Sequence, residues 1–121
     1  MKYFPLLVDE TGQMIVEAIR KFVNEEVMPI RDKIDDDKDH VLINSLLVKM
    51  SALGVFNVKM PKEKSTRLEP PYAISAAVME EFARGDAGIG LVASINSWAM
   101  AGAIYGRNAM VIDLYQQMQK K

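Results

Sequence analysis

The chain has 121 residues, a formal net charge of −1 and 50% hydrophobic residues, a composition that suits one folded globular domain. It contains no cysteine, which excludes disulfides, thiolate metal sites and thiol catalysis. The nearly balanced charge offers no basic surface to a polyphosphate backbone, so nucleic-acid binding is not expected.

The first ten residues contain only a short apolar run, which Pro5 interrupts. This run is too short for the hydrophobic core of an export signal. Together with the absence of cysteine, it favours a cytoplasmic location.

Residues 9–34 carry the pattern of a long amphipathic helix. Pro29 lacks a backbone donor and crowds the carbonyl of Glu25, so we expect a kink or a break there. The apolar side chains expected to face the core are Ile15, Ile19, Phe22, Val23, Val27, Ile30 and Ile34.

The acidic run 35–39 connects this helix to the next one. We interpret it as a solvated loop that caps the next helix, because the alternation and the glycine turn of a calcium loop are absent. The segment 41–53 is again helical, and Gly54 is expected to be its left-handed C-cap. Residues 55–61 indicate an extended or turn segment, and 62–69 a polar loop that adds nothing to the core.

A second group of helices follows Pro70-Pro71. The segment 72–84 is apolar on most sides, so we expect it to be central in the fold or covered from two sides. Gly85 is the expected C-cap of this helix and Asp86 the N-cap of the next, which gives a short connection and antiparallel packing. A last helix is expected over 109–119. The chain is therefore predicted to be all-α, an up-down bundle of about five helices forming one domain over residues 1–121.

The helix 86–106 stands out because it carries no charge between Asp86 and Arg107. One face of this helix is thin, because its residues are small or hydroxylic. Such a face either admits the backbone of a second helix or leaves room for a ligand. A membrane span is disfavoured because several glycine, serine and asparagine residues make the segment only moderately apolar, with no basic cluster beside it. The thin face holds Gly90, Ser94, Ser97 and Ala101, and the neighbouring thick face holds Leu91, Ile95, Trp98 and Tyr105.

Few residues suggest chemistry. His40 is the only histidine, and we interpret it as a solvated loop residue because a lone imidazole lacks the partners of a metal site or a triad. Glu80 and Glu81 project in different directions, so one is expected in a salt bridge and the other in solvent. The nine methionines favour core filling over an interface or an acyl pocket. Ser94, Asn96 and Ser97 are the polar groups best placed for a role, although a buried serine commonly bonds the carbonyl four residues back.

Several short motifs follow one another in a fixed order over nearly the whole chain. They are Phe22-Val23-Asn24-Glu25-Glu26-Val27-Met28-Pro29, the acidic turn 35–37, Met50-Ser51-Ala52-Leu53-Gly54-Val55-Phe56, Met60-Pro61, Glu80-Glu81-Phe82-Ala83-Arg84-Gly85-Asp86-Ala87, Ser94-Ile95-Asn96-Ser97 and Gly106-Arg107-Asn108. In this order and spacing the chain resembles the N-terminal helical domain of flavin-dependent acyl-CoA dehydrogenases, oxidoreductases of fatty acid metabolism.

The resemblance implies an enzyme of three parts: this helical domain, a middle β-domain and a C-terminal helical domain, which together bind FAD and oxidise the Cα–Cβ bond of an acyl-CoA thioester. In the family the catalytic glutamate and most FAD contacts lie in the two later domains. No catalytic, cofactor-binding or metal residue is therefore assigned in residues 1–121, and no tightly bound FAD is expected for this chain alone. The helix matching 89–103 forms part of the acyl pocket, which makes the substrate-binding candidates Ser94, Ser97, Trp98 and Ala101.

Two departures from the family pattern leave two hypotheses open. The paired glycines expected after Pro61 are absent, and Leu42-Ile43 stands where the family has Phe-Pro. The first hypothesis is a fragment or short subunit of an acyl-CoA dehydrogenase that contributes part of the acyl pocket and does not catalyse alone. The alternative is a non-catalytic helical interaction module. Under the first hypothesis, the expected partners are acyl-CoA and the remaining domains or subunits. An exposed apolar patch also predicts self-association of the chain.

Overall fold

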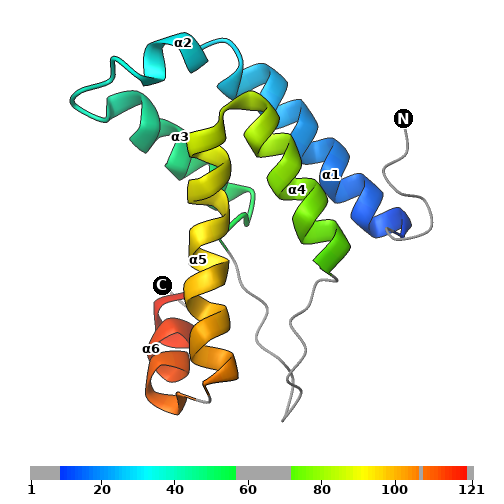
Figure 1. Cartoon of the computed structure of the whole chain (residues 1–121), viewed down its shortest axis with the longest axis vertical. Helices are drawn as coiled ribbons and strands as arrows, with labels where there is room; N and C mark the ends of the chain where they lie inside the picture. Colours follow the sequence, from blue (N-terminus) through cyan, green and yellow to red (C-terminus); the bar gives the residue numbers. More distant parts are fainter. Residues whose placement is uncertain (1–8, 57–71, 107, 120–121) are drawn as a thin grey trace.

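The computed structural model describes residues 9–56, 72–106 and 108–119, and within these ranges it contains helices and no strand. The helices are α1 (Glu10–Phe22), the π-helix η1 (Val23–Val27), α2 (Arg31–Ile34), α3 (Val41–Ala52), α4 (Tyr72–Gly85), α5 (Ala87–Tyr105) and α6 (Ala109–Gln119) (Figure 1). The all-α prediction is confirmed. The segment 55–61, expected to be extended or a turn, lies outside the described residues from 57 onward. The expected polar loop 62–69 lies outside them completely.

The first long helix begins and breaks where the sequence predicts. The Asp9 carboxylate accepts a hydrogen bond from the Gly12 N–H at 2.7 Å and so caps α1. The helical run ends at Val27, and a turn containing Pro29 separates it from α2.

The expected buried side of α1 was partly wrong. Ile15 is 41% exposed, whereas the adjacent Val16 is 1% exposed. Val16 precedes Ile19 by three residues and Val23 by seven, so it continues the buried row, and Ile15 lies at the edge of that row.

The acidic loop caps α3, as predicted. The Asp37 carboxylate accepts hydrogen bonds from the backbone N–H groups of Val41, Leu42 and Ile43 at 3.0, 2.8 and 3.0 Å. The His40 side chain is exposed, and its backbone adopts the left-handed conformation, with φ of 56°. The predicted left-handed C-cap is also confirmed, because Gly54 has φ of 75°.

The core lies between α1, η1, α2, α3, α4 and the first half of α5, while α6 packs beside the later part of α5 (Figure 1). Phe82 of α4 is fully buried and meets the ring of Phe22 edge-on, with ring centroids 6.2 Å apart. The buried residues of this core are Ile19, Val23, Val27, Ile34, Leu46, Met50, Phe82, Ile89 and Ala93.

The expectation that methionines fill the core holds only in part. Met50 is fully buried, as a core methionine should be, but Met14 and Met110 are largely exposed. The central position expected for α4 is confirmed, since α4 packs against α1, η1 and α5, although Met79 on it reaches the surface. Apolar side chains on most sides of a helix therefore did not require full burial here.

α4 ends at Gly85 as predicted, but the structure gives glycine a different role there. Among the described residues, the glycine with positive φ is Gly54, so Gly85 is not a left-handed cap. A Cβ on Gly85 would lie 2.6 Å from Cγ1 of Val23 and 3.1 Å from Cγ1 of Val27, so glycine is needed for close packing of α4 on η1. Asp86 caps α5 as predicted, accepting a hydrogen bond from the Ile89 N–H at 2.9 Å.

The thin face of α5 admits a second backbone at Gly90. A Cβ there would lie 2.9 Å from the backbone N and Cα of Ala83 in α4. The sequence left open whether this face meets a helix or a ligand. At Gly90 the structure shows that this face of α5 packs against the helix α4.

Two alanine substitutions on α5 are expected to have opposite effects. Gly90→Ala should lower the free energy of unfolding by about 1–3 kcal/mol, because Ala83 would have to move away. Gly102→Ala should raise it by roughly 0.5–1 kcal/mol, because a Cβ at Gly102 meets no described atom within 4 Å and alanine favours the helix. Urea unfolding followed by circular dichroism measures both. Equal stabilisation by the two variants would show that α4 and α5 are not in close contact at Gly90.

Candidate functional site

An exposed apolar row runs along α5. Leu91, Ile95 and Trp98 are 52%, 55% and 57% exposed, and Gly88 is exposed at the start of the same row. We call these four residues the α5 stripe. They recur at intervals of three and four residues, so they share one side of the helix. Large apolar side chains that share one exposed side of a helix form a candidate surface for contact with another apolar group.

The four sequence-predicted substrate residues are not equivalent in the structure. Ser94 is buried, and its hydroxyl donates to the Leu91 carbonyl at 2.8 Å, three residues back along the helix. Trp98, one helical turn later, belongs to the exposed α5 stripe. The side chains of Ser97, Ala101 and Asn96 lie outside the described part of the structure.

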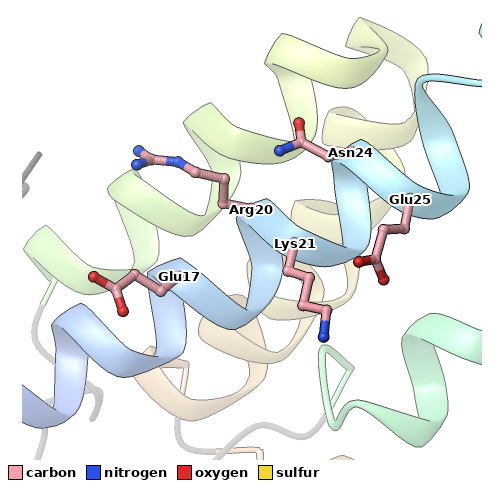
Figure 2. A pocket seen from close by; sticks show the side chains of 5 residues that line it. All are labelled: Glu17, Arg20, Lys21, Asn24 and Glu25. Atoms are coloured by element: carbon pink, nitrogen blue, oxygen red, sulfur yellow. The ribbon is translucent and has the colours of Figure 1, made fainter.

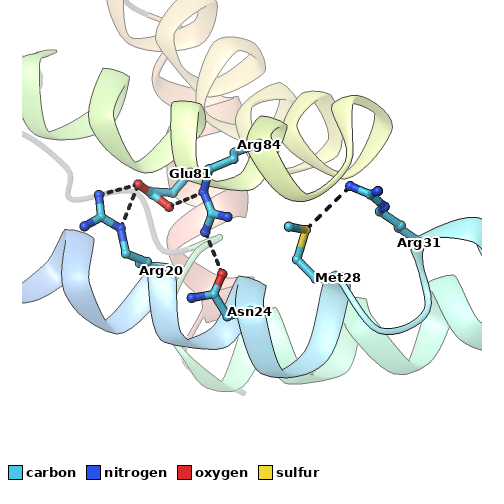
Figure 3. Close-up of polar contacts among 6 residues, drawn as sticks. All are labelled: Arg20, Asn24, Met28, Arg31, Glu81 and Arg84. Carbon is cyan, nitrogen blue, oxygen red and sulfur yellow. Dashed lines mark hydrogen bonds and ion pairs between the residues drawn. The ribbon is translucent and has the colours of Figure 1, made fainter.

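A buried carboxylate joins α1 to α4 (Figure 3). The Glu81 side chain is 1% exposed, and its Oε1 accepts hydrogen bonds from Nε and Nη2 of Arg20 at 3.0 and 2.6 Å. Its Oε2 accepts from Nε of Arg84 at 3.0 Å, and Nη2 of Arg84 donates to Oδ1 of Asn24 at 2.8 Å. The prediction that one of the two neighbouring glutamates forms a salt bridge and the other faces solvent is confirmed, since Glu81 is paired and Glu80 is exposed.

Sequence reasoning missed the partners of Glu81. Arg20 lies 61 residues away along the chain, and no local spacing connects the two. The sequence did contain a signal for one of the two partners, because Glu81 and Arg84 lie three residues apart on one helix, a spacing that allows an ion pair.

Two opposing effects act on the pKa of Glu81. Burial works to raise this pKa, while the hydrogen bonds from Arg20 and Arg84, aided by their positive charges, lower it. The second effect is larger, so the pKa lies below the ordinary 4.5. Glu81 is therefore an ionised structural group, and both of its oxygens already accept hydrogen bonds.

A shallow groove of about 250 Å³ lies on the outer side of α1 and the start of η1 (Figure 2). Its volume is below the roughly 300–1,000 Å³ of typical small-molecule pockets. Carboxylates and cations balance along it, so it attracts neither anions nor cations strongly. Its lining residues are Glu17, Arg20, Lys21, Asn24 and Glu25.

The described residues hold neither a cluster of metal ligands nor a membrane-spanning helix. No group of three or more His, Asp or Glu side chains there could hold a metal ion. None of the helices in the described ranges combines the length and apolar character that crossing a membrane requires.

The chain is similar to known proteins over most of its length. Residues 9–109 match the family model for the acyl-CoA dehydrogenase N-terminal domain. The human mitochondrial short-chain specific acyl-CoA dehydrogenase is 32% identical over 103 residues, which cover 84% of this chain and 24% of that protein. The rat protein of the same name is 33% identical over 102 residues, again covering 84% and 24%. The chain thus spans about a quarter of the length of these curated relatives. No solved structure gave a significant match.

Proposed function

The chain belongs to the acyl-CoA dehydrogenase family, whose N-terminal domain it matches, and on that premise we propose that it forms one wall of an acyl pocket and does not catalyse alone. The complete enzyme would be a flavin-dependent dehydrogenase that oxidises the Cα–Cβ bond of an acyl-CoA thioester. Its partners would be the acyl-CoA substrate and the remaining domains or subunits.

The exposed α5 stripe carries this proposal. An acyl chain is apolar and has no hydrogen-bonding groups, so it gains by burial against large apolar side chains without charge. Leu91, Ile95 and Trp98 offer such a surface, and α5 contains no charged residue. Ser97 and Ala101 are proposed as further contacts, and Ser94 as a buried support at the edge of the stripe.

We propose a short acyl chain as the substrate. Trp98 has the bulkiest side chain of the α5 stripe, and a bulky side chain in a pocket wall leaves less room for the end of an acyl tail. The relatives described above are named short-chain specific, which supports the same choice.

The described residues do not fit FAD by themselves. The groove on α1 is too small and too open for a dinucleotide, and the arginines Arg20 and Arg84 are engaged by Glu81. We therefore assign the FAD contacts and the catalytic base to the remaining domains. A cytoplasmic location stays a prediction, supported by the absence of cysteine, whereas the relatives are named as mitochondrial proteins.

A flavin titration tests whether the chain can act alone. The purified chain is mixed with FAD and then with butyryl-CoA and an electron-accepting dye, while the visible spectrum is recorded. We expect no stoichiometric flavin complex and no dye reduction above the rate without protein. A tight complex with turnover of butyryl-CoA would overturn the proposal that the chain does not catalyse alone.

The gene distinguishes the proposal from a non-catalytic interaction module. Reading its frame past the codon for Lys121 is the measurement. A continuing β-domain, or a partner gene that encodes the missing domains, supports the acyl-pocket function. A stop codon without such a partner gene supports the interaction module.

A further inference from the structure

We propose that Gly90 is a positioning residue that sets the length of the acyl chain that the pocket accepts. It lets α5 lie close to α4, and so it determines how far the apolar wall on α5 stands back from the substrate. This role rests on the acyl-pocket function proposed above, because it concerns where the wall of that pocket lies.

Gly90 has no room for a side chain on the side of α5 that faces α4. A Cβ added to Gly90 would lie 2.9 Å from the backbone N and Cα of Ala83 and 3.0 Å from its Cβ. Ordinary contacts between carbon atoms lie at roughly 3.5–4.0 Å, so Gly90→Ala requires the two helices to separate locally by roughly 0.5–1 Å. Two of these three atoms belong to the backbone, so a side-chain rotation cannot relieve the overlap.

α4 is held from the side opposite Ala83. Glu81 and Gly85 lie two residues before and two residues after Ala83, which places both on the far side of the helix. There Glu81 accepts hydrogen bonds from Arg20 of α1 at 3.0 and 2.6 Å (Figure 3). A Cβ on Gly85 would lie 2.6 Å from Cγ1 of Val23 in η1, so the two elements already pack closely. α4 therefore cannot retreat from α5, and α5 is the helix that must move.

A movement of α5 away from Ala83 carries the exposed wall outward. Ile95 lies five residues after Gly90, which is roughly 140° around the helix. It is 55% exposed, so no described residue blocks its movement completely. Under the proposed function this is the direction in which the acyl chain lies. The pocket would therefore lose room, and the longer acyl chains would be affected first.

Gly90 itself is buried and does not belong to the α5 stripe. Its effect on the substrate is therefore indirect, through the position of Ile95. This distinguishes Gly90 from Trp98, whose own bulk was proposed above to limit the acyl tail.

The experiment compares butyryl-CoA and hexanoyl-CoA as substrates of the complete flavoenzyme that contains this chain, with an electron-accepting dye. The measured quantity is kcat/KM for hexanoyl-CoA divided by kcat/KM for butyryl-CoA. Both values come from the same preparation, so their ratio does not depend on the fraction of enzyme that is folded. Gly90→Ala should lower the ratio by about tenfold, near the lower end of the discrimination that one methylene group causes in an apolar pocket.

Val16→Ala is the matched control. Val16 is 1% exposed on α1, so its truncation destabilises the fold without adding an atom between α4 and α5. It should leave the substrate ratio unchanged. A general loss of stability is in this way separated from a change in the position of α5.

A crystal structure of the Gly90→Ala enzyme gives a readout that does not use activity. We expect α5 to lie farther from Ala83 by roughly 0.5–1 Å, because the added Cβ needs an ordinary contact distance. The hydrogen bonds between Arg20 and Glu81 should be kept, which would show that α4 has stayed on α1.

Three results would overturn the role of Gly90 and leave the acyl-pocket function standing: a substrate ratio that Gly90→Ala does not lower, an equal fall in Val16→Ala, or a movement of α4 instead of α5. A complete enzyme without substitutions that turns over neither substrate would instead overturn the acyl-pocket function, and the role of Gly90 with it.

Discussion

Replacing Phe82 by alanine is expected to lower the free energy of unfolding by about 3–5 kcal/mol, the usual cost of removing a buried aromatic ring. Phe82 is fully buried and meets the Phe22 ring edge-on. Its removal takes away both the apolar burial and the ring contact, and the surrounding helices can close the cavity only in part. Domains are commonly stable by about 5–15 kcal/mol, so the variant should be close to unfolding in water.

Urea unfolding followed by circular dichroism tests this expectation, at a protein concentration low enough to keep the chain monomeric. Met79→Ala is the matched control, because Met79 lies on the same helix and is exposed. It should change the free energy of unfolding by less than about 1 kcal/mol. A Phe82→Ala variant as stable as the Met79→Ala variant would contradict the position of Phe82 in the core.

The second large effect is expected at Glu81. Glu81→Gln should lower the free energy of unfolding by about 2–3 kcal/mol at pH 7, because hydrogen bonds to charged groups contribute roughly 1.5–3 kcal/mol and the arginine partners are partly hydrated. The glutamine keeps the size of the side chain but cannot accept from Arg20 and Arg84 as a charged group. Glu80→Gln, at the exposed neighbouring position, should have an effect below about 0.5 kcal/mol.

The effect of Glu81 should depend on pH in one direction. Its pKa in the folded chain is lowered from 4.5, so the folded state holds the ionised form more strongly than the unfolded state does. The stability that Glu81 contributes is therefore complete above pH 4.5 and is lost as the pH falls through the lowered pKa. Urea unfolding at several pH values should show the wild type and Glu81→Gln converging in acid. A difference that stays constant down to the lowest pH would indicate that Glu81 is not ionised in the fold.

The helices and their caps could be predicted because each depends on residues close together in the chain. The Asp37 cap, the break at Pro29 and the Gly54 turn all follow from local backbone chemistry. Family membership also followed from short motifs in a fixed order, and the match over residues 9–109 confirms it.

α4 ends at Gly85 as predicted, but the reason for glycine there could not be predicted, because two physical roles lead to the same residue. Glycine after a helical run indicates a left-handed cap, but glycine is also needed where another element packs closely. The neighbours that decide between these roles, Val23 and Val27, lie about sixty residues earlier in the chain. The same distance hid Arg20 from Glu81.

The sequence alone determined which segments are helical, where they begin and end, and the family to which the chain belongs, since these depend on neighbouring residues and their order. Only the tertiary structure decided which side of α5 is covered, and that Val16 rather than Ile15 continues the buried row of α1. It buries Ser94 and leaves Trp98 exposed one turn later on the same uncharged helix. The reason is that α4 approaches α5 closely at Gly90, and the position of α4 depends on contacts with α1 and η1 that no local pattern contains.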